Sequence, residues 1–363
     1  MLELEFKNIV KVGILTFHEV FNPGAFLQAL ATQRLVESMG HEAKIIDYTP
    51  VTHRHSLVRD LRGLSWRLPF RFQRALANRK KDASFRKARN RWMNMTQRFE
   101  TAADVGKEQF DAVLIGADVV WNFQIERYGR DPLYFGTGLN TRKRISFAPS
   151  FGPCEVSDHP PDYVREGLRK FDHISVRDQN SKEIVRSLTQ LEPPIICDPA
   201  FHLDLTKLPR DCPEKKPFLL VYMVAPYVTT ETISEIRGFA KSKGLSVVAT
   251  LYHQKWADKN RTTGGPMEWL GLLHHADYVV TNTFHGMVFC CKMQKKFALQ
   301  YTPSIRNKSL HTVERLGLNP LIADKDRSIE QVLTSGFSFD GIEKQITEMT
   351  GQAKHFLVES LEN

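Results

Sequence analysis

The sequence lacks the features of membrane spans and of disulfide-stapled folds. No stretch without Lys, Arg, Asp or Glu is longer than 14 residues, whereas a transmembrane helix needs about 18–20 apolar residues. The five cysteines are odd in number and contain no C-x-x-C pair, so they indicate neither a disulfide framework nor a zinc knuckle. Cysteines of this kind are typical of a reducing compartment, and we predict a cytoplasmic protein.

Common motifs of cofactor chemistry are also missing. The sequence contains no G-x-G-x-x-G dinucleotide fingerprint, no P-loop, no H-E-x-x-H and no G-x-S-x-G. It also has no cluster of carboxylates in a metal-binding pattern. We therefore expect a protein that works without a bound metal or organic cofactor.

The composition is that of a globular protein with two domains. Of the 363 residues, 42% are hydrophobic and 25% are charged, and a domain takes roughly 150 residues. Short apolar runs alternate with helical periodicity, which is typical of parallel α/β folds. Three prolines and five charged residues between positions 208 and 217 indicate a linker. We predict Rossmann-like domains at 1–210 and 216–340 with a cleft between them, and a C-terminal helix at 341–363.

The positive charge is concentrated in one segment. The chain has a net charge of +9, whereas residues 51–98 hold 14 Lys and Arg against two acids, a local net of +12. Five apolar residues in this segment recur at spacings of three and four, which predicts an amphipathic helical insertion at 51–99. They are Phe85, Ala88, Trp92, Met95 and Phe99.

Two interpretations of the basic segment stay open. In the first, the helix packs on the domain and its cationic face is only solvated. In the second, the segment 51–99 contacts anionic material, either an acidic glycan or lipid at the inner face of the membrane. We find no nucleic-acid-binding motif and expect no nucleic-acid partner.

The strongest candidate for a functional loop is 281–286, Thr-Asn-Thr-Phe-His-Gly, between an expected strand and an expected helix. Ligands of parallel sheets bind where the strands end. Hydroxyl and amide side chains beside the free N–H groups of a helix start form a natural anion site. His285 would transfer a proton or contact a phosphate there. The alternative is that His285 only caps the helix.

Other expected strand ends carry further candidates. Asn22 and Gly24 begin the first helix, where Gly permits close approach of a ligand. Asp118 would hydrogen-bond a substrate hydroxyl, and Trp121 would offer a face for stacking on a sugar. Arg177 would bind a carboxylate or phosphate in a bidentate manner. Helix capping, core packing and an Arg–Asp ion pair with the next residue are the competing structural roles.

In their order along the chain, these loops resemble the motifs of the polysaccharide pyruvyl transferases. The resemblance covers about 300 residues, with Ala117, Asp178 and Asn282 standing where the family usually has Ser, Glu and Asp. The matching stretches are residues 22–28 (N-x-G-A-x-L-Q), 110–121 (D-x-x-x-x-G-S-D-x-x-W), 147–152 (Y-A-x-S-F-G), 174–181 (S-V-R-E-x-x-S), 198–199 (D-P), 265–269 (G-P-x-E-F) and 276–288 (A-D-x-V-V-T-D-S-F-H-G).

The resemblance implies a glycosyltransferase-B-like pair of domains and a ketal-forming pyruvyl transferase. The donor would be phosphoenolpyruvate, a substrate rather than a cofactor, and the acceptor a sugar of an exopolysaccharide or cell-wall glycan, either free or lipid-linked. The implied catalytic residue is His285. The implied donor-binding residues are Arg177, Lys308, Thr283, Gly286 and Asn282. The expected acceptor-binding residues are Asn22, Gly24, Gln28, Asp118, Trp121 and Ser150.

One departure from the family pattern concerns the donor. Some members carry S-R-L-H-G, in which an Arg before Leu-His holds the donor, whereas this chain has Thr283 at that position. Lys308 falls where many members have Arg, and it is the expected substitute cation.

Two other functions compete. A nucleotide-sugar-dependent glycosyltransferase with the same two domains would use a carboxylate to hold the donor ribose, and Glu268 could serve. A non-catalytic glycan- or membrane-docking protein would act mainly through its basic segment.

Overall fold

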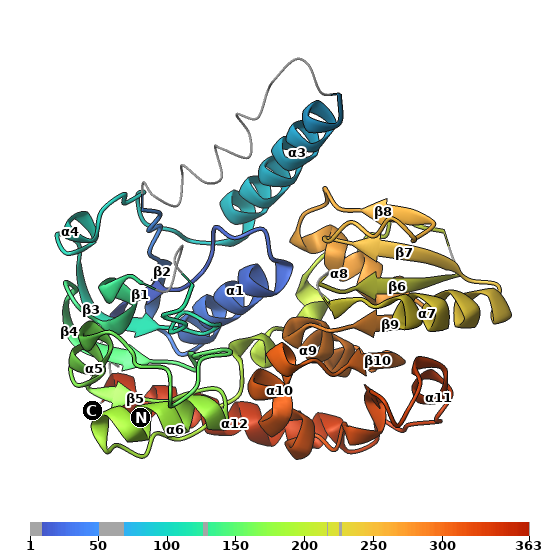
Figure 1. Ribbon diagram of the computed structural model, residues 1–363. Coiled ribbons are helices and arrows are strands. Elements are labelled where there is room, and N and C mark those ends of the chain that lie inside the picture. Colours follow the sequence, from blue (N-terminus) through green and yellow to red (C-terminus); the bar gives the residue numbers. More distant parts are fainter. Residues whose placement is uncertain (1–8, 51–68, 126–129, 216, 225–226, 363) are drawn as a thin grey trace, which may run out of the picture.

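The protein folds into two α/β domains that lie side by side (Figure 1). The computed structural model describes residues 9–50, 69–125, 130–215, 217–224 and 227–362. The first domain contains a five-stranded sheet of order β2-β1-β3-β4-β5, and the second a six-stranded sheet of order β11-β10-β9-β6-β7-β8. Neighbouring strands pair in parallel in both sheets. The predicted architecture of two Rossmann-like domains is therefore confirmed.

The central strands of the first sheet, residues 11–15 and 109–115, are apolar and largely buried, as a parallel sheet covered on both faces requires. The strand at residues 140–146 is more polar and is buried only at its C-terminal end. The strands of this sheet are β1 (Lys11–Leu15), β2 (Glu42–Ile45), β3 (Gln109–Ile115), β4 (Asn140–Ser146) and β5 (His173–Ile174). The α-helices of this half are α1 (Pro23–Ser38), α3 (Pro69–Trp92), α4 (Ala102–Val105), α5 (Asp162–Leu168) and α6 (Gln179–Thr189).

The second sheet follows the predicted linker. Its strands are β6 (Phe218–Tyr222), β7 (Ser246–Thr250), β8 (Lys259–Arg261), β9 (Tyr278–Thr281), β10 (Phe297–Gln300) and β11 (Ile322–Ala323). The α-helices of this half are α7 (Thr230–Ser242), α8 (Pro266–His275), α9 (Phe284–Lys292), α10 (Pro303–Arg315) and α11 (Ile329–Leu333).

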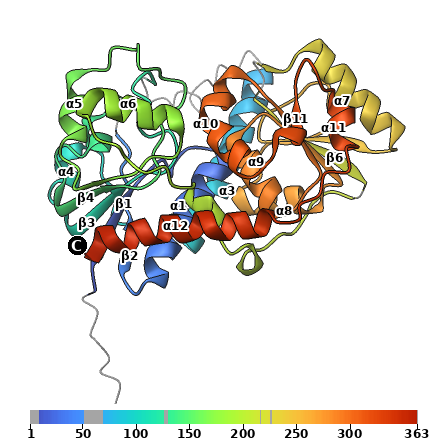
Figure 2. The ribbon, with the colours of Figure 1, turned by 90° about the horizontal axis from the view of Figure 1, so that it is seen from below.

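The last helix, α12 (Ile342–Glu362), runs from the second domain back to the first (Figure 2). The Lys143 ammonium of β4 donates hydrogen bonds to the carbonyls of Ser360 and Leu361, at 3.4 and 2.9 Å. Such contacts offset the partial negative charge at a helix C-terminus. The chain therefore crosses between the domains twice, once through the linker and once through α12.

The basic helix differs from its prediction. Helix α3 ends at Trp92, and Met95 and Phe99 lie in extended chain that forms bridges with Ile45 and Tyr48. The apolar spacing continues past the helix because this extended chain also buries side chains beside β2. Residues 51–68 lie outside the described part of the chain. None of the described helices is both long enough and apolar enough to span a bilayer.

Candidate active site

A cavity of about 300 Å³ lies between the two domains, at the carboxyl ends of strands from both sheets. This is where the fold places ligands. The first domain contributes Phe17, Val20, Asn22, Asp118, Val119, Ile125 and Arg177 to its wall, and the second contributes Tyr222, Val224, Tyr227, Tyr252, Asn282, Thr283, Phe284, His285, Thr302, Ile305 and Lys308.

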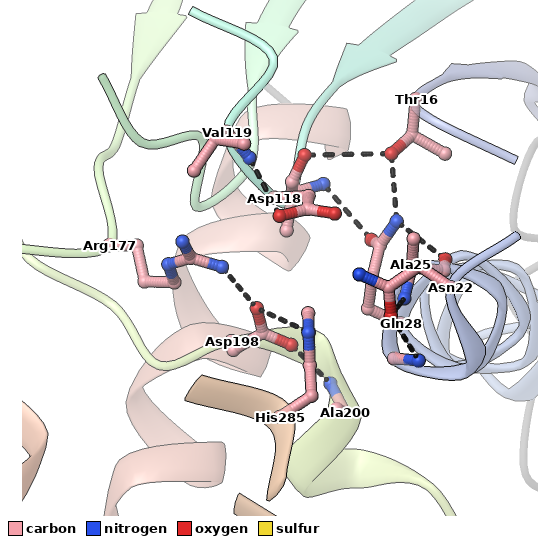
Figure 3. A network of polar contacts seen from close by, with 12 residues as sticks. Thr16, Asn22, Ala25, Gln28, Asp118, Val119, Arg177, Asp198, Ala200 and His285 are labelled. Carbon is pink, nitrogen blue, oxygen red and sulfur yellow. Dashed lines mark hydrogen bonds and ion pairs between the residues drawn. The ribbon is translucent and has the colours of Figure 1, made fainter. Parts of the chain in front are cut away.

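A buried carboxylate links the two walls of the cavity (Figure 3). Arg177 Nη1 donates to Asp198 Oδ2 at 2.8 Å, and His285 Nε2 lies 3.6 Å from the same oxygen. The backbone N–H of Ala200 donates to Asp198 Oδ1 at 2.9 Å. Burial raises the pKa of Asp198, but His285, Arg177 and this N–H outweigh burial and hold the pKa well below its usual range. Asp198 therefore stays ionised between the positively charged Arg177 guanidinium and the His285 imidazole, which can take up a proton.

Asp198 is the site residue that sequence reasoning missed. It was part of the D-P stretch of the family pattern, but nothing in its local sequence indicates a role. Its two partners, Arg177 and His285, lie 21 and 87 positions away in the chain. Only the packing of the two domains brings the three side chains together.

His285 does not cap α9. The cap is Thr283, whose Oγ1 accepts a hydrogen bond from the Gly286 N–H at 3.1 Å. The imidazole instead packs against Gly24 at the start of α1, where an added Cβ atom would lie 2.2 Å from His285 Cγ. Gly24 is needed because the helix start of one domain approaches the His285 ring of the other.

Arg177 lines the cavity but is almost fully buried, with 2% of its surface exposed. Its partner is Asp198 rather than the adjacent Asp178, which caps α6 by accepting from the Ser181 N–H at 2.8 Å. The guanidinium also lies over the Phe284 ring at 4.3 Å, a cation–π contact. Its Nε atom faces no acceptor within the described residues. Arg177 thus borders the cavity with its charge already largely offset.

Lys308 of α10 supplies a second cation to the cavity. In the described part of the chain, no carboxylate lies within ion-pair distance of the Lys308 ammonium. The salt bridges of the neighbouring Arg177 and His285 are both made with Asp198. Burial, together with the nearby Arg177, lowers the pKa of Lys308. A bound anion would raise this pKa again, because an opposite charge nearby favours the ammonium.

Asp118 belongs to the first-domain wall of the cavity. It has a φ angle of +65°, a conformation that Asp adopts more readily than most residues. Its Oδ1 accepts a hydrogen bond from the next backbone N–H, that of Val119, at 2.8 Å. The cavity wall therefore carries one carboxylate in addition to the buried Asp198.

Tyrosines form an aromatic wall on the second-domain side, which sequence reasoning also missed. The rings of Tyr222 and Tyr252 stack at 5.9 Å and 15°, and Trp269 packs edge-on against Tyr222 at 5.2 Å. Tyr227 at the cavity is 39% exposed. Tyr222 ends β6, Tyr227 follows it, and Tyr252 follows β7, so the tyrosines lie at two strand ends that the sequence analysis did not single out.

Trp121 is a correction to the expected site. Its side chain is completely buried, and its Nε1 donates to the Tyr134 carbonyl at 2.9 Å. Its ring stacks on Phe135 at 6.0 Å and is closely surrounded by other aromatic rings of the first domain. Because no face of this ring is open, Trp121 cannot stack on a sugar.

Gln28 and Ser150 are likewise internal. The Gln28 side chain donates to Thr16 Oγ1 at 2.8 Å and accepts from the Ala117 N–H at 3.3 Å, which joins α1 to the ends of β1 and β3 (Figure 3). The Ser150 Oγ accepts from the Gly152 N–H at 2.9 Å. Both side chains are fully buried and neither lines the cavity, so the expected acceptor contacts are replaced by structural ones.

The other expected residues are divided between lining and support. Asn22 and Asn282 line the cavity, but both also bond backbone: Asn22 caps α1, and Asn282 holds Val224 through its N–H and carbonyl, at 2.7 and 3.2 Å. Gly286 does not line the cavity. A Cβ atom there would lie 2.3 Å from Thr281 Oγ1, so Gly is needed for this turn.

Glu268, the carboxylate of the glycosyltransferase alternative, lies elsewhere. It borders a separate cavity of about 220 Å³ between α3 and α8. Because this cavity is separate, Glu268 cannot contact a donor bound beside His285. Burial raises the pKa of Glu268. Among the described residues, no group of three His, Cys, Asp or Glu side chains is arranged to hold a metal ion.

Two parallel sheets with a site between their strand ends define the glycosyltransferase-B class of fold. The structure of a putative UDP-N-acetylglucosamine 2-epimerase from Listeria monocytogenes is similar, with a TM-score of 0.52 and 10% identity over 98% of this chain and 96% of that one. Another UDP-N-acetylglucosamine 2-epimerase structure gives a TM-score of 0.50 and 12% identity, over 95% of each chain. At such low identity these likenesses show the fold alone.

The family follows from the sequence. The family model for polysaccharide pyruvyl transferase matches residues 22–299, so the chain belongs to the polysaccharide pyruvyl transferase family. No curated protein matches the chain. The matched range includes Asp118, Arg177, Asp198 and His285, and ends just before Lys308.

Proposed function

We propose that this protein transfers the pyruvyl group of phosphoenolpyruvate to a sugar of an exopolysaccharide or cell-wall glycan, as a cyclic ketal, with release of phosphate. The observation that carries the proposal is the grouping of His285, Arg177 and Lys308 around one cavity in a member of this family. A histidine and two cations around one cavity suit a reaction that moves protons while a phosphate departs.

The donor fits the charge of the cavity. Phosphoenolpyruvate is a small polyanion with a carboxylate and a phosphate. Lys308 would provide the net positive charge, and Arg177 would provide a planar donor next to the Asp198 carboxylate. The Thr283 hydroxyl, at the position where other members carry Arg, lines the cavity as a neutral group. Lys308 therefore takes over the charge that is missing there.

The bond changes can be assigned to the cavity residues. Two acceptor hydroxyls form two C–O bonds to C2 of the donor, and the C2–O bond to phosphate breaks. One hydroxyl proton ends on C3, which becomes a methyl group, and the other leaves with phosphate. His285 would deliver or accept these protons, while Asp198 offsets the charge on its ring. Asp118 on the first-domain wall would accept a proton from an attacking hydroxyl.

The acceptor fits the aromatic wall. Sugars present apolar C–H faces to aromatic rings, and the stacked Tyr222–Tyr252 pair gives a firmly supported surface. Tyr227 is the exposed aromatic side chain of the cavity. We therefore replace Trp121 by Tyr252 and Tyr227 as the proposed sugar-stacking residues, and keep Asn22 and Asp118 as polar acceptor contacts.

A donor competition tests the proposal. The protein is incubated with phosphoenolpyruvate, or with UDP- or GDP-sugars, across a panel of glycan acceptors, and the release of phosphate or nucleotide is measured. We expect phosphate release that depends on the acceptor, with the product identified as a pyruvyl ketal by mass spectrometry. Nucleotide release without phosphate release would instead support the glycosyltransferase alternative.

A further inference from the structure

Helix α3 presents a cationic face to solvent. Figure 1 shows the helix projecting from the first domain at the top of the view. Its only acid is Asp82. Five exposed cations lie on its described part: Arg79, Lys80, Arg86, Lys87 and Arg91. They occur over 13 residues, which span about 18 Å in an α-helix.

The opposite face of α3 is fixed to both domains. Phe85 and Ala88 are buried, and the Phe85 ring meets Phe21 of the first domain at 5.8 Å. The Lys81 ammonium donates to the Leu251 carbonyl of the second domain at 3.1 Å. Burial lowers the pKa of Lys81 to about 8. Lys81 therefore belongs to the packed face, and the exposed cations are held in a fixed array.

Little within the described structure neutralises this array. Arg86 lies 3.6 Å from Asp82, a pair of exposed side chains that contributes little. Among the described residues, no ion pair is formed by Arg79, Lys80 or Lys87. The helix makes ion pairs with acidic residues through Arg86, with Asp82, and through the buried Arg89, with Glu19. Like charges on one helix face repel each other. An extended anionic partner would remove that repulsion.

We propose that the exposed face of α3 binds the surface of an anionic lipid membrane. The helix projects from the first domain (Figure 1), so its exposed residues are accessible to a planar surface. Leu76, on the same helix, is 45% exposed, and helices at membrane interfaces combine apolar and cationic exposed residues. This proposal does not depend on the reaction assigned to the cavity.

The geometry favours a membrane over a single-stranded nucleic acid. Single-stranded nucleic acids bind by stacking on aromatic rings as well as by charge. Among the described side chains of α3, the aromatic one near the exposed cations is Trp92, and its ring is flanked by the guanidinium groups of Arg34 and Arg91, at 5.5 and 5.2 Å. A base would have to displace these cations.

The test is vesicle co-sedimentation of the full chain. Vesicles of phosphatidylcholine with and without phosphatidylglycerol are compared at low and high salt. We expect binding only with the anionic lipid, and weaker binding at high salt. Each cation near the surface contributes roughly a fivefold affinity, so the variant Arg79→Gln, Lys80→Gln, Arg86→Gln, Lys87→Gln should bind on the order of a hundredfold more weakly or worse.

A matched control removes four exposed lysines elsewhere: Lys241, Lys325, Lys344 and Lys354, each changed to Gln. This control should keep most of the binding, and Arg79→Lys with Arg86→Lys should bind like wild type. Equal loss in both fourfold variants would overturn the proposal, because net charge alone would then explain binding. Failure of the wild type to bind anionic vesicles, or tighter binding to RNA or to an acidic polysaccharide than to vesicles, would also overturn it.

Discussion

The two walls of the cavity carry similar charged groups in different states. On the first-domain wall, Arg177 is buried and paired with Asp198 at 2.8 Å. On the second-domain wall, Lys308 faces the cavity without an ion pair to a described residue. A charge count from sequence treats the two as equal. Arg177 is held by Asp198, which also lies close to His285, whereas Lys308 lines the cavity without such a partner among the described residues. We therefore propose Lys308, rather than Arg177, as the cation that matches the charge of a ligand.

The largest effect on this difference between the two walls should come from removing the carboxylate of Asp198, which Arg177 and His285 share. Asp198→Asn would leave Arg177 charged and unpaired in a buried site, which typically costs about 3–5 kcal/mol of unfolding free energy. Urea unfolding measures it. Because the folded pKa of Asp198 lies below its unfolded value, this stabilisation is present above the ordinary Asp pKa and is lost as the pH falls.

Asp178→Asn is the control for that experiment, since Asp178 caps α6 and is not among the residues that line the cavity between the domains. Asn also caps well, so the loss there should be well below 1 kcal/mol. If Asp198→Asn were no less stable than Asp178→Asn, the ion pair would not organise this wall.

The second-largest effect should come from His285, where the two walls meet. His285→Ala should fold normally and lose transfer by about 10²-fold or more, the usual scale for a general acid or base. Steady-state phosphate release measures it. His275→Ala, on α8 and outside the cavity, is the control and should keep wild-type turnover. Near wild-type turnover in His285→Ala would leave the histidine with a packing role only.

On the opposite wall, Lys308→Ala should raise the donor KM about tenfold, or about 1.4 kcal/mol. The kcat should change less, because an ammonium that matches ground-state charge mainly affects binding. Lys308→Arg should restore the donor KM, since it keeps the charge. An unchanged donor KM in Lys308→Ala would show that Arg177 supplies the cationic contact despite its pairing.

The smallest effect concerns pH. Burial and Arg177 lower the pKa of Lys308, so its ammonium loses its proton at a lower pH than a free lysine does. The donor KM should therefore begin to rise at a lower pH than the ordinary lysine pKa would give. Lys308→Arg should flatten this rise because guanidinium stays charged. A rise of the same size in Lys308→Arg would assign the pH dependence to another group.

Much of this arrangement could be predicted from sequence, because strand and helix periodicity places loops at a common edge of a sheet. That reasoning brought Arg177, His285 and Asp118 to one cavity. It failed for Trp121, since a strand-end position does not determine whether a side chain points outward or into the aromatic core. It also gave Asp198 no role, because an ion pair between distant segments leaves no periodic pattern.

The helix α12 has a mechanical consequence. A body joined to another at one point can turn about any axis through that point, whereas a body joined at two points turns about the line between them. The linker and the return into α12 are two such joints, and the Lys143 contacts with Ser360 and Leu361 fasten the second one to the first domain. Opening the domains about the line between these joints would also break the contact of α3 with the second domain, where Lys81 donates to the Leu251 carbonyl.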